Sequence, residues 1–201
     1  MKATHTPASP ALQLTQRWLE RAVIGLNLCP FAKAVHTKGQ IRWVECEAAS
    51  PVAVLQLLAQ ELQYLAAADA AQVDTTLIVA PQLLPRFADF NDFLGVADDA
   101  LAELQLDGTL QIAAFHPQWV FAGTAEGDIG NHTNRAPYPT LHLLREASVA
   151  RAVAAYPDAE AIYGRNIQTL QRLGLAGWRA LLKGRATPAA AAPAAPRCRA
   201  S

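Results

Sequence analysis

The sequence predicts an α/β protein with a small three-stranded parallel sheet (β-α-β-α-β) and extra N- and C-terminal helices. Short runs of apolar and β-branched residues indicate strands, and apolar residues spaced three and four apart indicate helices between them. With 201 residues, of which 52% are hydrophobic and 17% charged, the chain is long enough to bury one substantial core. Helical connections between successive strands favour parallel strands.

The predicted helices are recognised by apolar stripes and by residues suited to helix starts. Ser50 fits an N-cap and Pro51 the first turn of a helix. The expected helical segments are Leu12 to Gly25, the segment that starts at Ser50-Pro51, Pro85 to Leu106, and Pro139 to Leu182 with a break near Tyr156-Pro157.

The predicted strands are Ile41 to Cys46, Thr75 to Ala80, and Leu110 to Phe115. The second strand is almost continuously apolar, which is typical of a strand that is covered on both faces. Residues 1–183 are expected to form one α/β domain. Residues 184–201 are rich in Ala and Pro, have no apolar periodicity and are expected to be a disordered tail.

Bulk properties indicate a soluble, cytoplasmic protein. No apolar run reaches membrane-spanning length, and the first ten residues lack a signal-peptide pattern. Three cysteines, at positions 29, 46 and 198, leave one unpaired in any disulfide scheme, which favours reduced thiols. The net charge of zero argues against a general nucleic-acid binder. Cofactors and the oligomeric state stay open.

A long polar loop follows the third predicted strand. It begins after Phe115, ends at Tyr138 and has 23 residues, more than a compact domain usually carries without a functional reason. In open parallel sheets, ligands bind beyond the carboxyl ends of the strands, where this loop begins. Asn131, Asn134 and Arg135 offer amide and guanidinium groups for a carboxylate or phosphate, as does Arg145 in the helix expected after the loop.

Cys29 is a candidate for thiol chemistry. Pro30 suits the first position of a short helix, so Cys29 is expected at its N-cap, where the backbone N–H groups stabilise a thiolate. The alternative is a small buried residue without reactivity.

Two histidines are candidates for proton transfer. His116 directly follows the third strand, and His142 is expected on the helix from Pro139, four residues before Glu146 and on the same face. A hydrogen-bonded surface pair is the alternative reading of His142 and Glu146. Because the loop must return from the strand to the helix, we expect His116 and His142 to border one pocket, with Arg135 on its wall.

Four short segments carry a family resemblance: Leu26–Ala32, Phe115–Pro117, Asn134–Pro139 and Leu141–Glu146. Through them the chain resembles the bacterial family of unknown function numbered 1415, from about Leu12 to Leu182. The resemblance implies that these segments are recurring motifs of that family, and it implies no particular chemistry.

Three functions remain open, and whether the protein is an enzyme is one of the open points. The first is an enzyme on a small anionic metabolite, with Cys29, His116, His142 and Glu146 as catalytic residues at the carboxyl edge of the sheet. The second is a metal-binding protein that uses the same four side chains. The third is a non-catalytic interaction module. No P-loop, Rossmann glycine fingerprint or HExxH motif is present.

Overall fold

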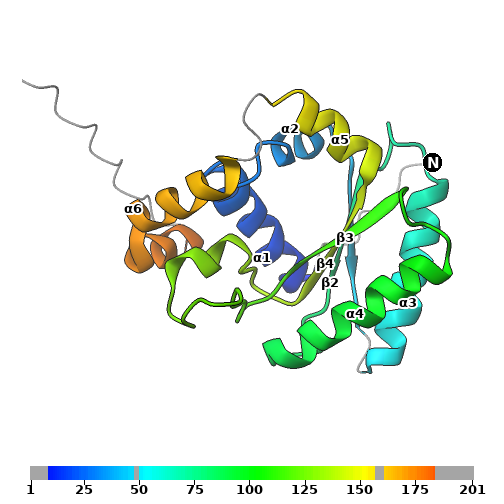
Figure 1. Cartoon of the computed structure of the whole chain (residues 1–201), viewed down its shortest axis with the longest axis horizontal. Helices are drawn as coiled ribbons and strands as arrows, with labels where there is room; N and C mark the ends of the chain where they lie inside the picture. The colour runs from blue at the N-terminus through cyan, green and yellow to red at the C-terminus, as the bar shows by residue number, and fades with distance from the viewer. Residues whose placement is uncertain (1–8, 48–49, 157–160, 184–201) are drawn as a thin grey trace, which may run out of the picture.

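The computed structural model describes residues 9–47, 50–156 and 161–183 and has an α/β architecture (Figure 1). The strands are β1 (Ile41–Glu45), β2 (Thr75–Val79), β3 (Leu110–Phe115) and β4 (Thr140–Arg145). The helices are α1 (Pro10–Trp18), η1 (Leu19–Ile24), α2 (Ala32–Thr37), α3 (Pro51–Ala67), α4 (Phe87–Glu103), η2 (Ile129–Thr133), α5 (Glu146–Ala154) and α6 (Ile162–Leu182). The expected tail at 184–201 lies outside the described residues.

The four strands form one mixed sheet in the order β1-β2-β4-β3. β1 runs parallel to β2, whereas β4 is antiparallel to both of its neighbours, β2 and β3. The prediction of three parallel strands is correct for the direction of β1, β2 and β3. It is wrong in the number of strands, because β4 lies between β2 and β3 and makes the sheet mixed.

The strand β4 occupies a segment that was predicted to begin a helix. Its side chains alternate: Leu141 and Leu143 are buried in the core under α3 and α4, while His142 and Leu144 face the opposite side of the sheet. Both neighbouring strands offer hydrogen-bonding edges along the whole segment, so pairing outweighs the helical spacing of the sequence.

Helices cover both faces of the sheet (Figure 1). α3 and α4 lie on one face and form a closely packed core with alternate residues of β2, β3 and β4. α1, η1, α2 and α5 lie on the other face, and α6 packs on η1 and η2. The predicted start at Ser50-Pro51 is present, since the hydroxyl of Ser50 accepts from the Ala53 N–H. α1 begins at Pro10, two residues before the predicted start at Leu12, and the hydroxyl of Ser9 caps it by accepting from the Leu12 N–H.

η1 continues α1 as a stretch of π-helix, a wider turn that often accompanies functional sites. The widened turn ends at Gly25, whose N–H donates to the carbonyl of Glu20 at 2.9 Å. Leu19 and Val23 of this turn face the sheet across an open space. None of the helices in the described ranges is both long and apolar enough to cross a membrane.

Candidate ligand-binding cavity

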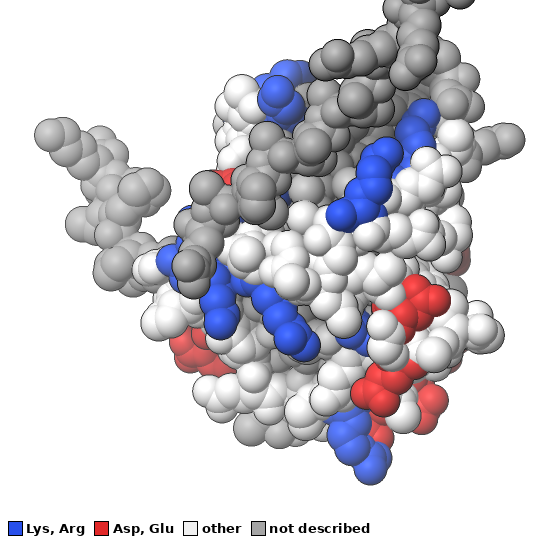
Figure 2. Space-filling model, turned by 90° about the vertical axis from the view of Figure 1, so that its left-hand side faces the viewer, with Lys and Arg blue, Asp and Glu red and all other residues white. Residues whose placement is uncertain are grey.

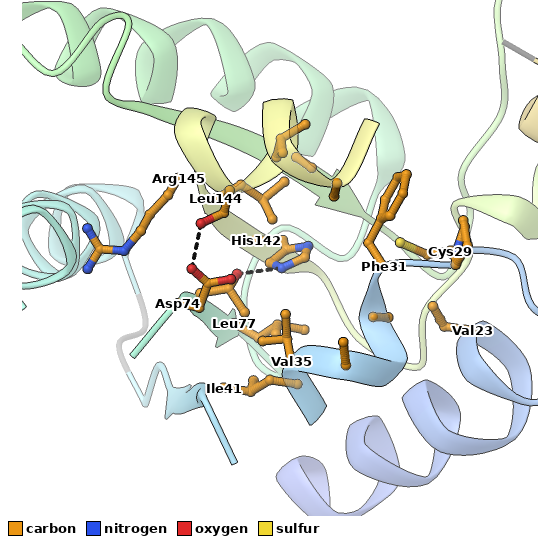
Figure 3. A pocket seen from close by; sticks show the side chains of 18 of the residues that line it. Val23, Cys29, Phe31, Val35, Ile41, Asp74, Leu77, His142, Leu144 and Arg145 are labelled. Atoms are coloured by element: carbon orange, nitrogen blue, oxygen red, sulfur yellow. Dashed lines mark hydrogen bonds between the residues drawn. The ribbon is translucent and has the colours of Figure 1, made fainter. Parts of the chain in front are cut away.

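A cavity of about 550 Å³ lies between the sheet and the helices α1, η1, α2 and α5 (Figure 3). Most of its lining is apolar, and its size is typical of small-molecule sites. The space exists because many of the facing side chains are single methyl groups that do not reach across it. These are Ala32 and Ala34 near α2, Ala113 on β3, and Ala152 and Ala155 at α5.

His142 is the polar side chain in the middle of the sheet face that forms the cavity floor. It lies opposite Leu77 on β2 and Ala113 on β3, so its closest strand neighbours are apolar. Its Nε2 is 2.7 Å from the hydroxyl of Thr75. Burial lowers the pKa of His142 from 6.5 to about 4, so the ring is neutral at pH 7.

The other polar groups of the lining lie toward the start of β2 and α5. The hydroxyl of Ser148 donates to Asp74 Oδ1 at 2.6 Å, which ties α5 to the sheet. Gln111 on β3 and Tyr156 after α5 also line the cavity. Polar side chains are a minority of the lining, and His142 and Thr75 are hydrogen-bonded to each other in its floor.

Cys29 borders the cavity on the side away from β1 but does not cap a helix. α2 begins at Ala32, its N-cap residue is Phe31, and the carbonyl of Cys29 accepts from the Ala32 N–H at 3.3 Å. The predicted N-cap position of Cys29 is therefore wrong, because the turn after Pro30 delays the helix by two residues. The thiol is partly exposed and faces the same cavity as His142 (Figure 3).

Arg145 reaches away from the cavity and holds the C-terminal end of α3. Its guanidinium donates to the carbonyls of Leu65 and Ala68 at 2.6 Å each, and to that of Val73 at 3.1 Å. These carbonyls lie at and beyond the last turn of a helix, where backbone acceptors lack helical partners. Arg145 thus has a structural role, and the structure does not aim it at a ligand.

His116 lies on the other side of the sheet from His142. Its ring is buried against Phe87 and Phe90 of α4, at centroid distances of 5.6 and 5.0 Å. Nδ1 accepts from the Gln118 N–H, so Nε2 carries the proton and donates to the Leu84 carbonyl at 3.0 Å. Burial lowers the pKa of His116. The structure does not bring His116 and His142 to one pocket.

The polar side chains of the long loop form hydrogen bonds that stabilise the loop's own conformation. The buried amide of Asn131 bonds with Phe121, Thr124 and Ala125. Arg135 donates to the carbonyls of Trp119 and Glu126, at 3.0 and 2.7 Å. Asn134 donates to Ala114 at 3.3 Å.

These contacts give the loop residues backbone partners. The loop is ordered around η2, and its predicted anion-binding side chains do not converge on the 550 Å³ cavity.

Glu146 is the first residue of α5 and does not share a helix face with His142, which is on β4. The expected i, i+4 pair is wrong because the helix begins only after position 145. Among the residues that the structure describes, no three His, Cys, Asp or Glu side chains lie close enough to hold a metal ion together.

Comparison with known families identifies one match. A model for the family described as "Protein of unknown function (DUF1415)" matches residues 11–180. The chain belongs to the DUF1415 family. Searches of curated proteins and of solved structures found no match. The sequence resemblance is thereby confirmed over nearly the whole described chain.

The motifs that carried the DUF1415 resemblance fall on both sides of the sheet. Cys29, Pro30, Phe31 and His142 line the cavity. His116 and the segment that starts at Asn134 support the loop and the α4 side. In this DUF1415 chain, the cavity therefore joins two motifs that are more than a hundred residues apart in the sequence.

Sequence reasoning did not single out several residues of the cavity in this DUF1415 protein. Thr75 was predicted only as the start of a strand, and Trp18 only as part of the helix from Leu12 to Gly25. A polar residue that begins a buried strand, such as Thr75, was the available signal of the cavity in the sequence.

A second, smaller cavity of about 350 Å³ shares Val23, Cys29 and Phe115 with the first.

Proposed function

We propose that the protein binds a small, mostly apolar molecule in the 550 Å³ cavity between the sheet and α1, η1, α2 and α5. The observation that carries the proposal is an apolar cavity of ligand size with a hydrogen-bonded histidine, His142, in its floor. Such a combination of apolar walls and few polar groups is typical of small-molecule sites.

The cavity favours an uncharged ligand over the anionic metabolite expected from the sequence. Among the described residues of the lining, Arg145 is the only Lys or Arg, and its guanidinium bonds to three backbone carbonyls. Arg135 is held by loop carbonyls. On the face shown in Figure 2, Lys and Arg side chains are scattered, and the lowest one lies beside Asp and Glu side chains. An anion in the cavity would therefore lose its hydration without gaining a free cation.

Binding rather than proton transfer is the role that suits His142. With a pKa of about 4, the ring is a weak base at neutral pH, whereas a general base works best with a pKa near the operating pH. Cys29 borders the same cavity and is placed to contact the ligand. A reducing, cytoplasmic location is part of the proposal, since it keeps Cys29 and Cys46 as free thiols.

A fluorescence titration with N-phenyl-1-naphthylamine, a neutral apolar probe, tests the proposal. The full chain is expected to bind the probe saturably, with one site per chain. Ala152→Phe places a ring in the cavity and is expected to weaken binding at least about tenfold, or ~1.4 kcal/mol.

Ala150→Phe is the matched control, because Ala150 lies on the same helix but is exposed. This variant is expected to retain the affinity of the unmodified chain. Equal affinity in both variants, or no saturable binding in any of the three proteins, contradicts the proposed function.

A further inference from the structure

The hydrogen bonds below His142 fix which of its ring nitrogens carries the proton. The hydroxyl of Thr75 lies 2.6 Å from the carbonyl oxygen of Leu143 and 2.7 Å from Nε2 of His142. A carbonyl oxygen only accepts, so the single hydroxyl proton of Thr75 must point to Leu143. The Thr75 oxygen is then left as an acceptor, and Nε2 of His142 must supply the proton between them.

The opposite arrangement leaves two oxygens in contact without a proton. If Thr75 donated to Nε2, its oxygen and that of Leu143 would face each other at 2.6 Å with their lone pairs opposed. Thr75 is only 5% exposed, so solvent has little access to relieve that contact. The neutral ring of His142 is therefore the Nε2–H tautomer, and its Nδ1 carries a lone pair.

Nδ1 of His142 opens onto the cavity. Nδ1 has no hydrogen-bond partner within the described part of the chain, and it is not fully enclosed by protein atoms. The side-chain atoms there that are enclosed and lack a partner are Trp18 Nε1, Thr76 Oγ1, Trp119 Nε1 and His132 Nδ1. Since His142 lines the cavity, a ligand that fills it meets this lone pair (Figure 3).

We propose that the ligand of this cavity carries a neutral hydrogen-bond donor, a hydroxyl or an N–H group, which donates to Nδ1 of His142. This inference rests on the proposed function and narrows it. A carbonyl or ether oxygen at this position would place its lone pair against the lone pair of Nδ1, and neither atom would have a hydrogen-bond donor. A charged ammonium donor at Nδ1 would lose its hydration among apolar side chains, because Leu77 and Ala113 are the strand neighbours of His142. The class is thus an alcohol, a phenol or a neutral N–H heterocycle with an apolar body.

The experiment compares 2-naphthol with 2-methoxynaphthalene, which has the same ring system but lacks the donor. Isothermal titration calorimetry of the full chain at pH 7 is expected to show about tenfold tighter binding of 2-naphthol. In His142→Leu, which keeps an apolar side chain of similar reach, the two compounds are expected to bind within about twofold of each other.

The outcomes separate the two proposals. Equal affinity of the two compounds for the unmodified chain overturns the donor preference and leaves the binding function in place. Failure of both compounds and of N-phenyl-1-naphthylamine to bind overturns the binding function, and the donor preference with it.

The tautomer is tested independently of any ligand. A long-range ¹H–¹⁵N spectrum of the labelled chain is expected to show His142 with the proton on Nε2 and an unprotonated Nδ1. In Thr75→Val the hydroxyl that holds the proton on Nε2 is removed, so a mixture of tautomers and a smaller preference for 2-naphthol are expected. A ring protonated on Nδ1 in the unmodified chain overturns the inference even if the Thr75→Val chain does not fold.

Discussion

The hydroxyl of Thr75 and Nε2 of His142 lie 2.7 Å apart, and they join β2 to β4 beneath a cavity with apolar walls. The two residues are 67 positions apart in the chain. Their contact gives the cavity floor one oriented polar group, and the surrounding apolar side chains keep it neutral. Both consequences are open to measurement.

Stability should fall on acidification because of His142. Its folded pKa of about 4 is below the ordinary 6.5, so between these values the unfolded chain binds a proton that the folded chain does not. The contribution of neutral His142 is therefore complete above about pH 6.5 and is lost progressively toward pH 4, by about 3 kcal/mol.

Urea unfolding of the unmodified chain and of His142→Leu between pH 7.5 and 4 measures this loss. Burial also lowers the pKa of His116 and His132, but these groups are common to both proteins, so the difference isolates His142. The same pH dependence in both proteins would show that His142 is not held neutral by the fold.

Replacement of His116 should affect stability without affecting the cavity. His116→Ala removes a buried ring and leaves the Leu84 carbonyl and the Gln118 N–H without their partner, a loss of about 2–4 kcal/mol. Probe affinity should not change, since His116 packs on the α4 side. His36→Ala, at a partly exposed histidine, is the control and should cost under about 1 kcal/mol. A loss of probe binding in folded His116→Ala would place His116 at the site.

The close turn at the end of η1 should not tolerate a side chain. A Cβ at Gly25 would lie 2.3 Å from the backbone oxygen of Arg21, so Gly25→Ala forces the turn to open and should lower stability by more than about 2 kcal/mol. Gly95→Ala is the control, because Gly95 lies inside α4 with nothing within 4 Å of the added atom. It should raise stability by up to about 1 kcal/mol. Equal effects of the two changes in thermal unfolding would contradict the close approach at Gly25.

Sequence patterns predicted the parts of the fold that depend on local chemistry. The helix start at Pro51 and the strands at Thr75 and Leu110 follow from a capping residue and apolar runs. The prediction for the β4 segment was wrong because two patterns overlap there. A two-residue alternation, typical of a strand, coexists with an i, i+4 spacing that continues into α5, and the segment is too short for either pattern to be decisive.

The role of Arg145 depends on carbonyls at and beyond the end of α3, which are 72 to 80 positions away in the chain. The cavity depends on small side chains from separate elements. Such non-local relationships were not readable from residue spacing.

The thiols should react in the order of their access. Cys29 faces the cavity and is partly exposed, while Cys46 is 1% exposed in the α3 and α4 core. With Cys198→Ser introduced to remove the third thiol, limiting iodoacetamide should alkylate Cys29 well before Cys46, and saturating 2-naphthol should slow Cys29. Denatured chain should show similar rates for both thiols. Equal rates in the folded chain, or no effect of a compound that binds, would contradict the placement of Cys29 beside the ligand.

The central claim is that this cavity holds the ligand, and a crystal structure of the chain with 6-bromo-2-naphthol tests it most directly. The anomalous signal of bromine locates the ring independently of how the compound is fitted to the density. The account predicts bromine among the apolar walls, with the hydroxyl of the compound within hydrogen-bond distance of His142 Nδ1. Bromine bound elsewhere, with the space between the sheet, α2 and α5 filled by the protein's own side chains, would contradict it.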